Sequence, residues 1–404
     1  MKRSLLSTLG AAASAALLLT GCTQSMSSGH GMASPMGSTS TTQAAGLRTT
    51  LNALFAEHVN LAAAATGSAL DGREADFKAA AGALDANSVA IAQAIGSVYG
   101  KDAEAAFLPL WRRHIGFVVD YTVGAASKDS ARQTRAVNAL VAYTDDFGAF
   151  LASANPNLPK PVVADLVKHH VLTLKDVIDA QAARDQAKAY TAIRTASAHM
   201  AKIADPLAGA IAKQFPDKFA GSTMTPAAGL RTALNVAMRE HVYLAAAATG
   251  AALGGRDDEF KAAAGALDAN SVAIAQAIGS VYGKDAGAAF LPLWRRHIGF
   301  VVDYTIGAAS QDRAKQDKAV GDLIAYTADF GAFLASANPN LPKPVVAGLV
   351  KHHVVTLKDV IDAQAAKDPA KAWNAARTAA GHMQQVADPL AEAIVKQFPD
   401  RYRG

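Results

Sequence analysis

Apolar residues recur at helical spacing along most of the chain. Leu51, Leu54 and Leu61 fall on one face of a helix, and His58 falls on the same face. Alanine is abundant and runs of β-branched residues are short, which favours helices over strands. Turn signals interrupt the pattern at Asp71-Gly72, Lys128-Asp129 and Arg184-Asp185. The pattern therefore predicts an all-α fold made of helical hairpins.

The sequence repeats itself with an offset of 183 residues. Residues 77–126 match residues 260–309 at 48 of 50 positions. We therefore expect two tandem helical-bundle domains, at residues 45–219 and 229–404, joined by a linker at residues 220–228. Because 51% of the residues are hydrophobic, each domain has enough apolar material for its own core.

A second period, of 56 residues, lies inside each copy. Each unit of this period in the first copy contains a leucine that is followed four residues later by a histidine. The first copy has Leu54, Leu110 and Leu166, with His58, His114 and His170; the second copy keeps the spacing at His241, His297 and His353. A unit of this length suits one helical hairpin, so each domain is predicted to contain three hairpins, or about six helices.

The returning helix of each hairpin carries a polar residue at an equivalent place. These residues and the histidines stand about 14 residues from the turn of their hairpin, or roughly 20 Å at ~1.5 Å per residue. We therefore expect one buried polar layer in each domain. The first layer would consist of His58, Asn87, His114, Tyr143, His170 and His199, and the second of His241, Asn270, His297, Tyr326, His353 and His382.

Histidines in a buried layer need partners, because an unpaired buried polar group costs on the order of 1–3 kcal/mol. Three explanations stay open: metal ligation, a structural hydrogen-bonded layer, and binding of haem or another ligand. Metal ligation is favoured because several imidazoles converge. The layer holds no carboxylate, which disfavours a ferritin-type iron or manganese centre. Histidine-only ligation suits copper, with zinc as the alternative.

The first residues have the pattern of a secretion signal. Lys2 and Arg3 precede an apolar run, which ends in Leu19-Thr20-Gly21-Cys22. This tetrapeptide resembles a bacterial lipobox, and the resemblance implies a signal peptide at residues 1–21 and a lipid on Cys22. We then expect anchoring to a membrane of the cell envelope, the outer membrane if the bacterium has two. Cys22 is the only cysteine, which excludes intramolecular disulfides and a thiolate metal site.

Residues 22–44 are rich in Ser, Thr and Gly and are predicted to form a flexible tether. Four residues of the tether have side chains that bind soft or borderline ions such as copper. They are Met26, His30, Met32 and Met36. Chance enrichment in a tail is the alternative explanation.

The formal net charge of +5 is mild, and no stripe of basic residues is interleaved with aromatic ones. We therefore expect no nucleic-acid partner. Arginine pairs adjoin one layer histidine in each copy and would attract a small anion such as superoxide; a solvated basic helix face is the alternative. These arginines are Arg112, Arg113, Arg295 and Arg296.

Two further pairs of residues adjoin the layer. Glu57 and Glu240 precede the first histidine of each copy, where they would either orient a metal ligand or lie in solvent. Pro109 and Pro292 stand five residues before a layer histidine and predict either a helix kink or a helix start.

The helical part resembles repeat domains of bacterial envelope proteins, some of them linked to copper. It also resembles a helical lipoprotein subunit of a surface-layer assembly with a proposed copper-dependent superoxide dismutase activity. The resemblance rests on the lipobox, on the Asn-Pro-Asn-Leu-Pro joints at residues 155–159 and 338–342, and on the segments from Tyr-Gly to Trp-Arg-Arg-His-Ile. It implies a copper-binding envelope lipoprotein with superoxide dismutase-type activity. Two alternatives stay open: a non-catalytic copper or metal buffer, and a structural subunit of an envelope or surface-layer assembly.

Overall fold

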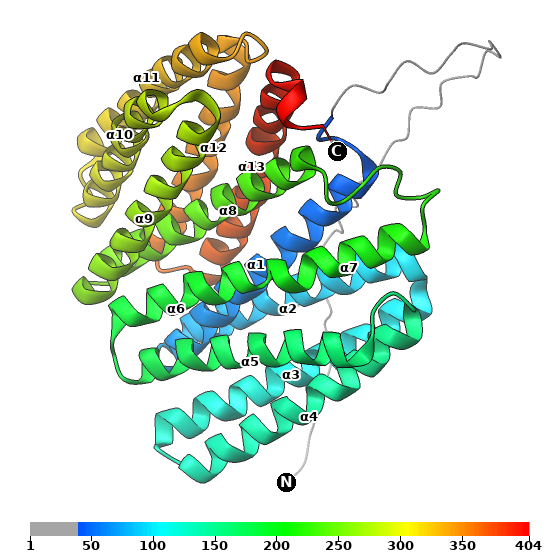
Figure 1. Ribbon diagram of the computed structural model, residues 1–404. Coiled ribbons are helices and arrows are strands. Elements are labelled where there is room, and N and C mark those ends of the chain that lie inside the picture. The colour runs from blue at the N-terminus through cyan, green and yellow to red at the C-terminus, as the bar shows by residue number, and fades with distance from the viewer. Residues whose placement is uncertain (1–38, 404) are drawn as a thin grey trace, which may run out of the picture. The chain divides into compact units, whose positions relative to one another are not determined.

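The computed structural model describes residues 39–403 (Figure 1). The first copy of the repeat forms α1 (Gln43–Leu70), α2 (Glu74–Tyr99), α3 (Lys101–Ser127), α4 (Ser130–Ala154), α5 (Lys160–Ala182), α6 (Gln186–His199) and α7 (Ala201–Gln214). The second copy forms α8 (Pro226–Leu253), α9 (Asp257–Tyr282), α10 (Lys284–Ala309), α11 (Arg313–Ala337), α12 (Lys343–Ala365) and α13 (Pro369–Gln397), and a 3₁₀ turn follows at Pro399–Arg401. No strand occurs in this part of the chain, so the predicted all-α fold is confirmed.

Capping residues begin helices, and turn residues end them, at the places that the sequence predicts. Asp129 and Asp185 each accept a hydrogen bond from the backbone N–H three residues later, at the starts of α4 and α6. In the three hairpin turns of the first half, Gly72, Lys128 and Arg184 have φ angles of 70°, 56° and 57°. This left-handed conformation terminates the preceding helix. The three turns predicted in this half are therefore confirmed.

The first half has seven helices where about six were expected. Its last helix is interrupted at Met200, which divides it into α6 and α7. In the second half α13 runs without a break through Met383, the equivalent residue. Pro109 and Pro292 lie inside α3 and α10, so neither of them marks a helix start.

α1 is the central helix of the first half, and α8 has the same place in the second. α1 contacts α2, α3, α5, α6 and α7. All of residues 51–61 except Leu54 and Asn60 are buried. A helix that is enclosed on nearly every side brings any polar residue near its middle into the core. His58, on this stretch, is 0% exposed.

The two halves pack against each other with approximate two-fold symmetry. α1 contacts α8, and the two equivalent contacts α2–α13 and α6–α9 flank that pair (Figure 1). Thr49 on α1 and Thr232 on α8 are equivalent residues of the two copies, and their hydroxyl oxygens lie 3.0 Å apart. A contact between equivalent residues marks the symmetry axis of an isologous interface.

Two reciprocal ion pairs cross this interface. Glu57 of α1 accepts a hydrogen bond of 2.6 Å from Nε of Arg377 on α13. Glu240 of α8 pairs in the same way with Arg194 on α6, at 3.0 Å. Glu57 is only 6% exposed, so its carboxylate depends on Arg377 for compensation of its charge.

The segments before each half differ from the predicted boundaries. Ser40 donates from its backbone N–H and its hydroxyl to Glu392 of α13, and its carbonyl accepts from Arg231 of α8. Thr39 and Ser40, predicted to be part of the flexible tether, therefore lie against the second half. α8 begins at Pro226, three residues before the expected start of the second domain. The predicted signal peptide, Cys22 and the Met/His cluster of the tether lie outside the described residues.

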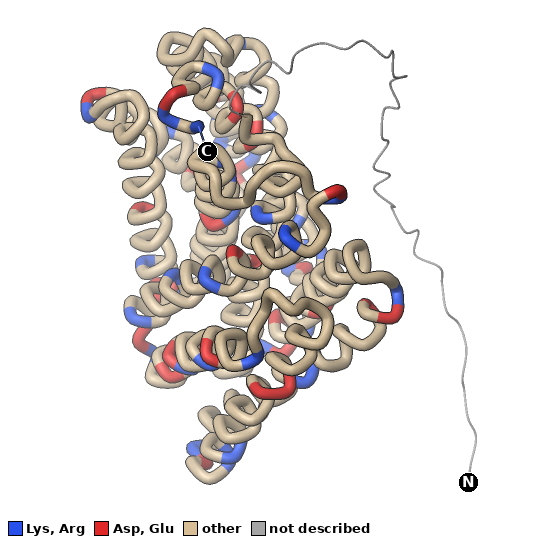
Figure 2. The backbone as a smooth tube through the Cα atoms, turned by 45° about the vertical axis from the view of Figure 1, so that its right-hand side comes forward, with Lys and Arg blue, Asp and Glu red and all other residues tan. Residues whose placement is uncertain are grey.

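Acidic and basic residues are interspersed along the helices (Figure 2). Between residues 39 and 403, no helix combines the length and the apolar character that a bilayer span requires.

The Glu57–Arg377 pair offers a test of the interface between the halves. We expect Glu57→Gln to lower the free energy of unfolding by about 1–3 kcal/mol, because it leaves a partly buried guanidinium without its counter-charge. Glu74→Gln removes an exposed pair with Lys78 and should leave the free energy of unfolding nearly unchanged, because solvent screens such pairs. Denaturant unfolding of both variants checks this, and equal costs would contradict the importance of the buried pair.

Candidate metal centre

Three histidines from three helices meet in the core of each half. In the first half His58 comes from α1, His114 from α3 and His170 from α5. Nε2 of His58 lies 3.3 Å from Nε2 of His114. One ring nitrogen of each of the three histidines lies within 4.8 Å of the others. The convergence predicted from the 56-residue period is thus found for these three residues, which we call the first triad.

The second half repeats this arrangement. His241, His297 and His353 form the second triad, on α8, α10 and α12. Its two facing Nε2 atoms, of His241 and His297, are again 3.3 Å apart. The third ring has the same place in both triads. The ring centroid of His170 lies 5.9 Å from that of His58, and His353 lies at the same distance from His241.

Most ring nitrogens of the triads have no hydrogen-bond partner. The six histidines are at most 5% exposed. In the first triad Nδ1 of His58, Nδ1 of His114 and both nitrogens of His170 are buried and unpaired, and the second triad lacks partners at the four equivalent atoms. Each unpaired buried polar atom costs on the order of 1–3 kcal/mol. The fold therefore maintains two clusters of unsatisfied nitrogen atoms at a considerable energetic cost.

The triad imidazoles are uncharged at physiological pH. Burial, which penalises the protonated form, lowers the pKa of His114 to about 3 and that of His170 to about 4. Burial also lowers the pKa of His58 well below its usual value, and its two neighbouring histidines lower this pKa further. His297 and His353 have pKa values of about 3 and about 4 for the same reason. A neutral imidazole has one nitrogen with a free lone pair, which is the form that binds metal ions.

Aromatic side chains surround the first triad. The indole of Trp111 lies 4.7 Å from His114 and 5.0 Å from His58 between ring centroids, edge-on to both imidazoles. The ring of Tyr143 lies 5.4 Å from His114, and its hydroxyl is buried without a partner. Trp294 and Tyr326 have the same places in the second half. The sequence analysis missed the tryptophans, although their position three residues before a layer histidine places them on the same helix face.

The triads contain histidines alone. No aspartate or glutamate of residues 39–403 joins either cluster of metal-ligating atoms. The triads therefore contain no carboxylate, although Glu240 accepts a hydrogen bond from the layer residue Asn270 in the second half. An ion bound here would have no anionic side chain among its ligands.

The fourth histidine of each predicted layer does not join the triad. Nε2 of His199 lies 3.2 Å from the carbonyl oxygen of Leu166, and His382 bonds Leu349 in the same way. Asn87 donates to the carbonyl oxygen of Leu54. In all three contacts the side chain meets the carbonyl of the residue 33 positions earlier. His199 and Asn87 thus tie together the two helices of their hairpins. His199 and His382 were expected among the metal-binding histidines, but helix packing turns them toward a backbone carbonyl and not toward the triad.

The remaining layer residues lie near the triads without joining them. Asn270 donates to the carbonyl oxygen of Ala237 and to Glu240. Oδ1 of Asn87 and Oδ1 of Asn270 are buried and unpaired. Three histidines of each expected layer therefore approach one another, whereas its asparagine bonds a neighbouring helix.

The arginines beside His114 are paired with carboxylates of neighbouring helices. Arg112 bonds Asp85 of α2, and Arg113 bonds Asp146 of α4. All four side chains are 44–62% exposed. In the second half the equivalent pairs are Arg295–Asp268 and Arg296–Asp329. The adjacent carboxylates offset part of the positive charge of these arginines on the outer surface, and the steering of an anion stays a prediction.

Glu57 and Glu240 are neither solvated residues nor part of the triads. Both belong to the ion pairs between the halves, and Glu240 also accepts from Asn270. Each precedes a triad histidine directly in the sequence. The two alternatives considered for these glutamates are therefore both wrong.

No protein-family model, curated protein or solved structure was found to match this chain. The interpretation of the triads consequently rests on their own geometry and chemistry.

Buried neutral histidines make the stability of the metal-free protein depend on pH. The pKa values of the triad histidines in the folded protein lie below their value of about 6.5 in the unfolded protein. As the pH falls, the unfolded protein therefore takes up protons first. The contribution of these histidines to stability is full above pH 6.5 and is lost as the pH falls toward their folded-state pKa values. When the pH is lowered from 7 to 5, the free energy of unfolding should fall by about 2 kcal/mol for each triad histidine.

Denaturant unfolding at the two pH values measures this loss. We expect the loss to be smaller by about 2 kcal/mol in His114→Leu than in the wild-type protein. His169→Gln changes an exposed histidine next to the first triad and serves as the control. An unchanged loss in His114→Leu would contradict the burial of a neutral imidazole.

Proposed function

We propose that each half of the protein binds one copper(I) ion through its three triad histidines. The observation that carries the proposal is the convergence of three neutral imidazoles whose ring nitrogens are buried and mostly unpaired. A metal ion would satisfy one nitrogen of each ring at once. A purely hydrogen-bonded layer would leave His170 and His353 without any partner, and this favours a ligand over a structural role.

The spacing of the nitrogens suits a metal ion. Imidazole nitrogens lie about 2.0–2.1 Å from ions of this size, which places two such ligands roughly 3.3–3.6 Å apart. The Nε2 atoms of His58 and His114 already have a separation of 3.3 Å. The third nitrogen lies within 4.8 Å of the others, so a small side-chain rotation of His170 would complete the set.

The lack of carboxylates favours a monovalent ion. Transfer of an ion from water into an apolar core is costly unless nearby charges compensate it, and the cost rises steeply with ionic charge. Neutral imidazoles supply no negative charge. Copper(I) carries one positive charge and accepts imidazole ligands, whereas zinc(II) would bring two charges to the same site.

Copper binding without turnover is the role that burial supports best. Superoxide is an anion, and it would have to cross an apolar interior to reach histidines that are at most 5% exposed. The dismutase-type activity stays a prediction, as do the lipid on Cys22, the envelope location and an envelope partner. A protein that holds copper(I) behind a dry shell acts as a copper buffer or carrier.

The stoichiometry of copper binding tests the proposal. We expect the purified protein to bind two copper(I) ions per chain in anaerobic competition with a chromophoric chelator, and to bind zinc(II) more weakly. His114→Leu and His297→Leu should each remove one ion, and the double variant should remove both. His169→Gln should keep both ions. If the double variant binds as much copper(I) as the wild-type protein, the triads are not the copper sites. An assay of superoxide consumption with the same proteins tests the predicted dismutase-type activity.

Substitution of His170 separates a ligand role from a structural role. Both of its ring nitrogens are unpaired, so His170→Leu should raise the free energy of unfolding of the metal-free protein by about 1–3 kcal/mol. The same variant should lose copper binding in the first half. The matched variant His199→Leu removes a hydrogen bond to Leu166 and should lower stability. Destabilisation by His170→Leu as large as that by His199→Leu would favour a structural polar layer.

A further inference from the structure

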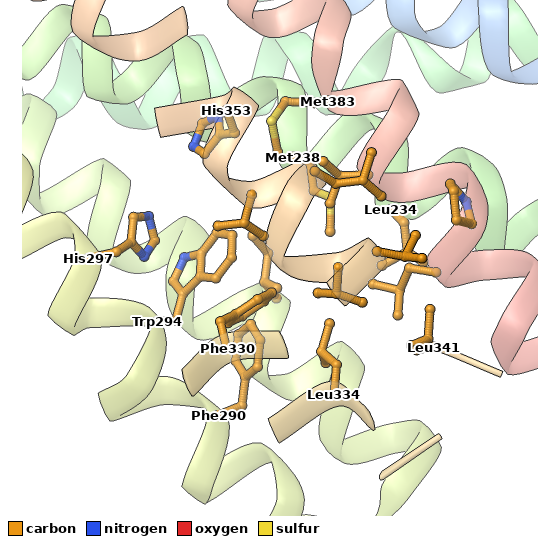
Figure 3. A pocket seen from close by; sticks show the side chains of 18 of the residues that line it. Leu234, Met238, Phe290, Trp294, His297, Phe330, Leu334, Leu341, His353 and Met383 are labelled. Carbon is orange, nitrogen blue, oxygen red and sulfur yellow. The ribbon is translucent and has the colours of Figure 1, made fainter. Parts of the chain in front are cut away.

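The second triad lies at the end of an apolar cavity. The cavity has a volume of about 90 Å³ and reaches from His297 and His353 to the loop between α11 and α12. Figure 3 shows the two imidazoles at one end and Leu341 of that loop at the other, with Met238 and Trp294 between them. At the loop end the cavity is bordered by exposed residues, among them Val345, which is 55% exposed. The cavity therefore connects the second triad with the surface.

The first half has the same cavity in a much smaller form. Its volume is about 20 Å³, and the equivalents of all fourteen residues that line it also line the larger cavity. Every residue around the small cavity is buried. The equivalents of the loop residues and of Val345 do not border it. The small cavity beside the first triad therefore stops short of the loop that the larger cavity beside the second triad reaches.

Two differences between the copies explain the larger volume. Phe55 in the first half is replaced by Met238 in the second, and Ile203 is replaced by Val386. The ring of Phe55 stacks on Trp111 at 5.8 Å and 14° and fills the space beside the first triad. Methionine is narrower than phenylalanine, and valine lacks one methylene of isoleucine. Rigid packing around such truncations leaves a cavity instead of collapsing.

The walls determine which molecules the cavity accepts. Apart from the imidazoles and Tyr326, the buried part of the lining is formed by aliphatic, aromatic and methionine side chains. A water molecule needs two to four polar partners in such a place, and an ion needs charge compensation. A volume of about 90 Å³ has room for only a few heavy atoms. The unpaired polar atoms of His297, His353 and Tyr326 give water partners at the triad end, whereas the rest of the lining is apolar and suits a small uncharged apolar molecule.

We propose that the cavity in the second half admits a small uncharged molecule of the size of dioxygen to the second triad, and that the first triad excludes it. The two centres then differ in access although their histidines are equivalent. Binding in the cavity does not require a metal ion, so this part of the proposal is independent of copper. Direct contact of the molecule with copper(I) rests on the proposed function.

Xenon is a suitable probe of the cavity in the metal-free protein. Crystals of the protein under xenon pressure should show one xenon site per chain, beside Trp294, and none beside Trp111. Met238→Phe should abolish the site, and the milder Val386→Ile should reduce its occupancy. The reciprocal variant Phe55→Met with Ile203→Val should create a second site. Xenon in both halves of the wild-type protein, or in neither, would overturn the proposal.

Carbon monoxide tests access to the metal once copper(I) is bound. Infrared spectra of the protein with two copper(I) ions should show a C–O stretching band that corresponds to one carbon monoxide per chain. The band should vanish in Met238→Phe while both ions stay bound. A band of undiminished intensity in that variant would refute access through this cavity. Failure to bind copper at all would refute the proposed function and leave the xenon result unaffected.

Discussion

The burial of three neutral imidazoles at one height of a helical bundle is the constraint on which the rest of this structure depends. Each triad keeps four ring nitrogens unpaired in the core. Burial penalises the protonated imidazoles and lowers the pKa values of the histidines, and no carboxylate belongs to the triads to offset this effect. A site of this kind is unfavourable for the empty fold and favourable for an ion of low charge. This opposition between stability and binding is typical of functional sites.

The central helix of each half links the histidine triad to the interface between the halves. On α1, Glu57 reaches across to Arg377 and the next residue, His58, joins the first triad. On α8, Glu240 and His241 repeat this division of roles. Successive helix residues point in directions about 100° apart, which lets neighbours serve two different surfaces. The position of each triad is therefore fixed by packing on both sides of the same helix.

The duplication gave two equivalent centres, and a few substitutions made their surroundings different. The segment that carries the second histidine of each triad is nearly identical in the two copies. The differences that matter lie on other helices, at Phe55 and Met238 and at Ile203 and Val386. They leave the ligands unchanged and alter only the volume beside them. Changes of shape next to an unchanged ligand set are a simple route by which duplicated sites acquire different access.

Much of the fold could be predicted from the sequence because it follows from local patterns. The apolar periodicity gave the helices, the turn residues ended them, and the 56-residue period placed His58, His114 and His170 at one height. Length and rise per residue determine height along a bundle, so the convergence of these three residues was predictable. The interruption at Met200 was not predictable from the repeat, because the equivalent helix α13 runs through Met383 without a break.

Direction and access were decided by the tertiary structure alone. Periodicity placed His199 on the buried face but did not reveal that it would meet the carbonyl oxygen of Leu166 instead of the triad. The pairing of Arg112 with Asp85, and of Glu57 with a residue 320 positions away, depends on how helices pack. The cavity beside the second triad likewise depends on whether neighbouring side chains fill a space. The sequence by itself determined which residues share a level, because that is a property of one helix; which of them touch is a property of several helices packed together.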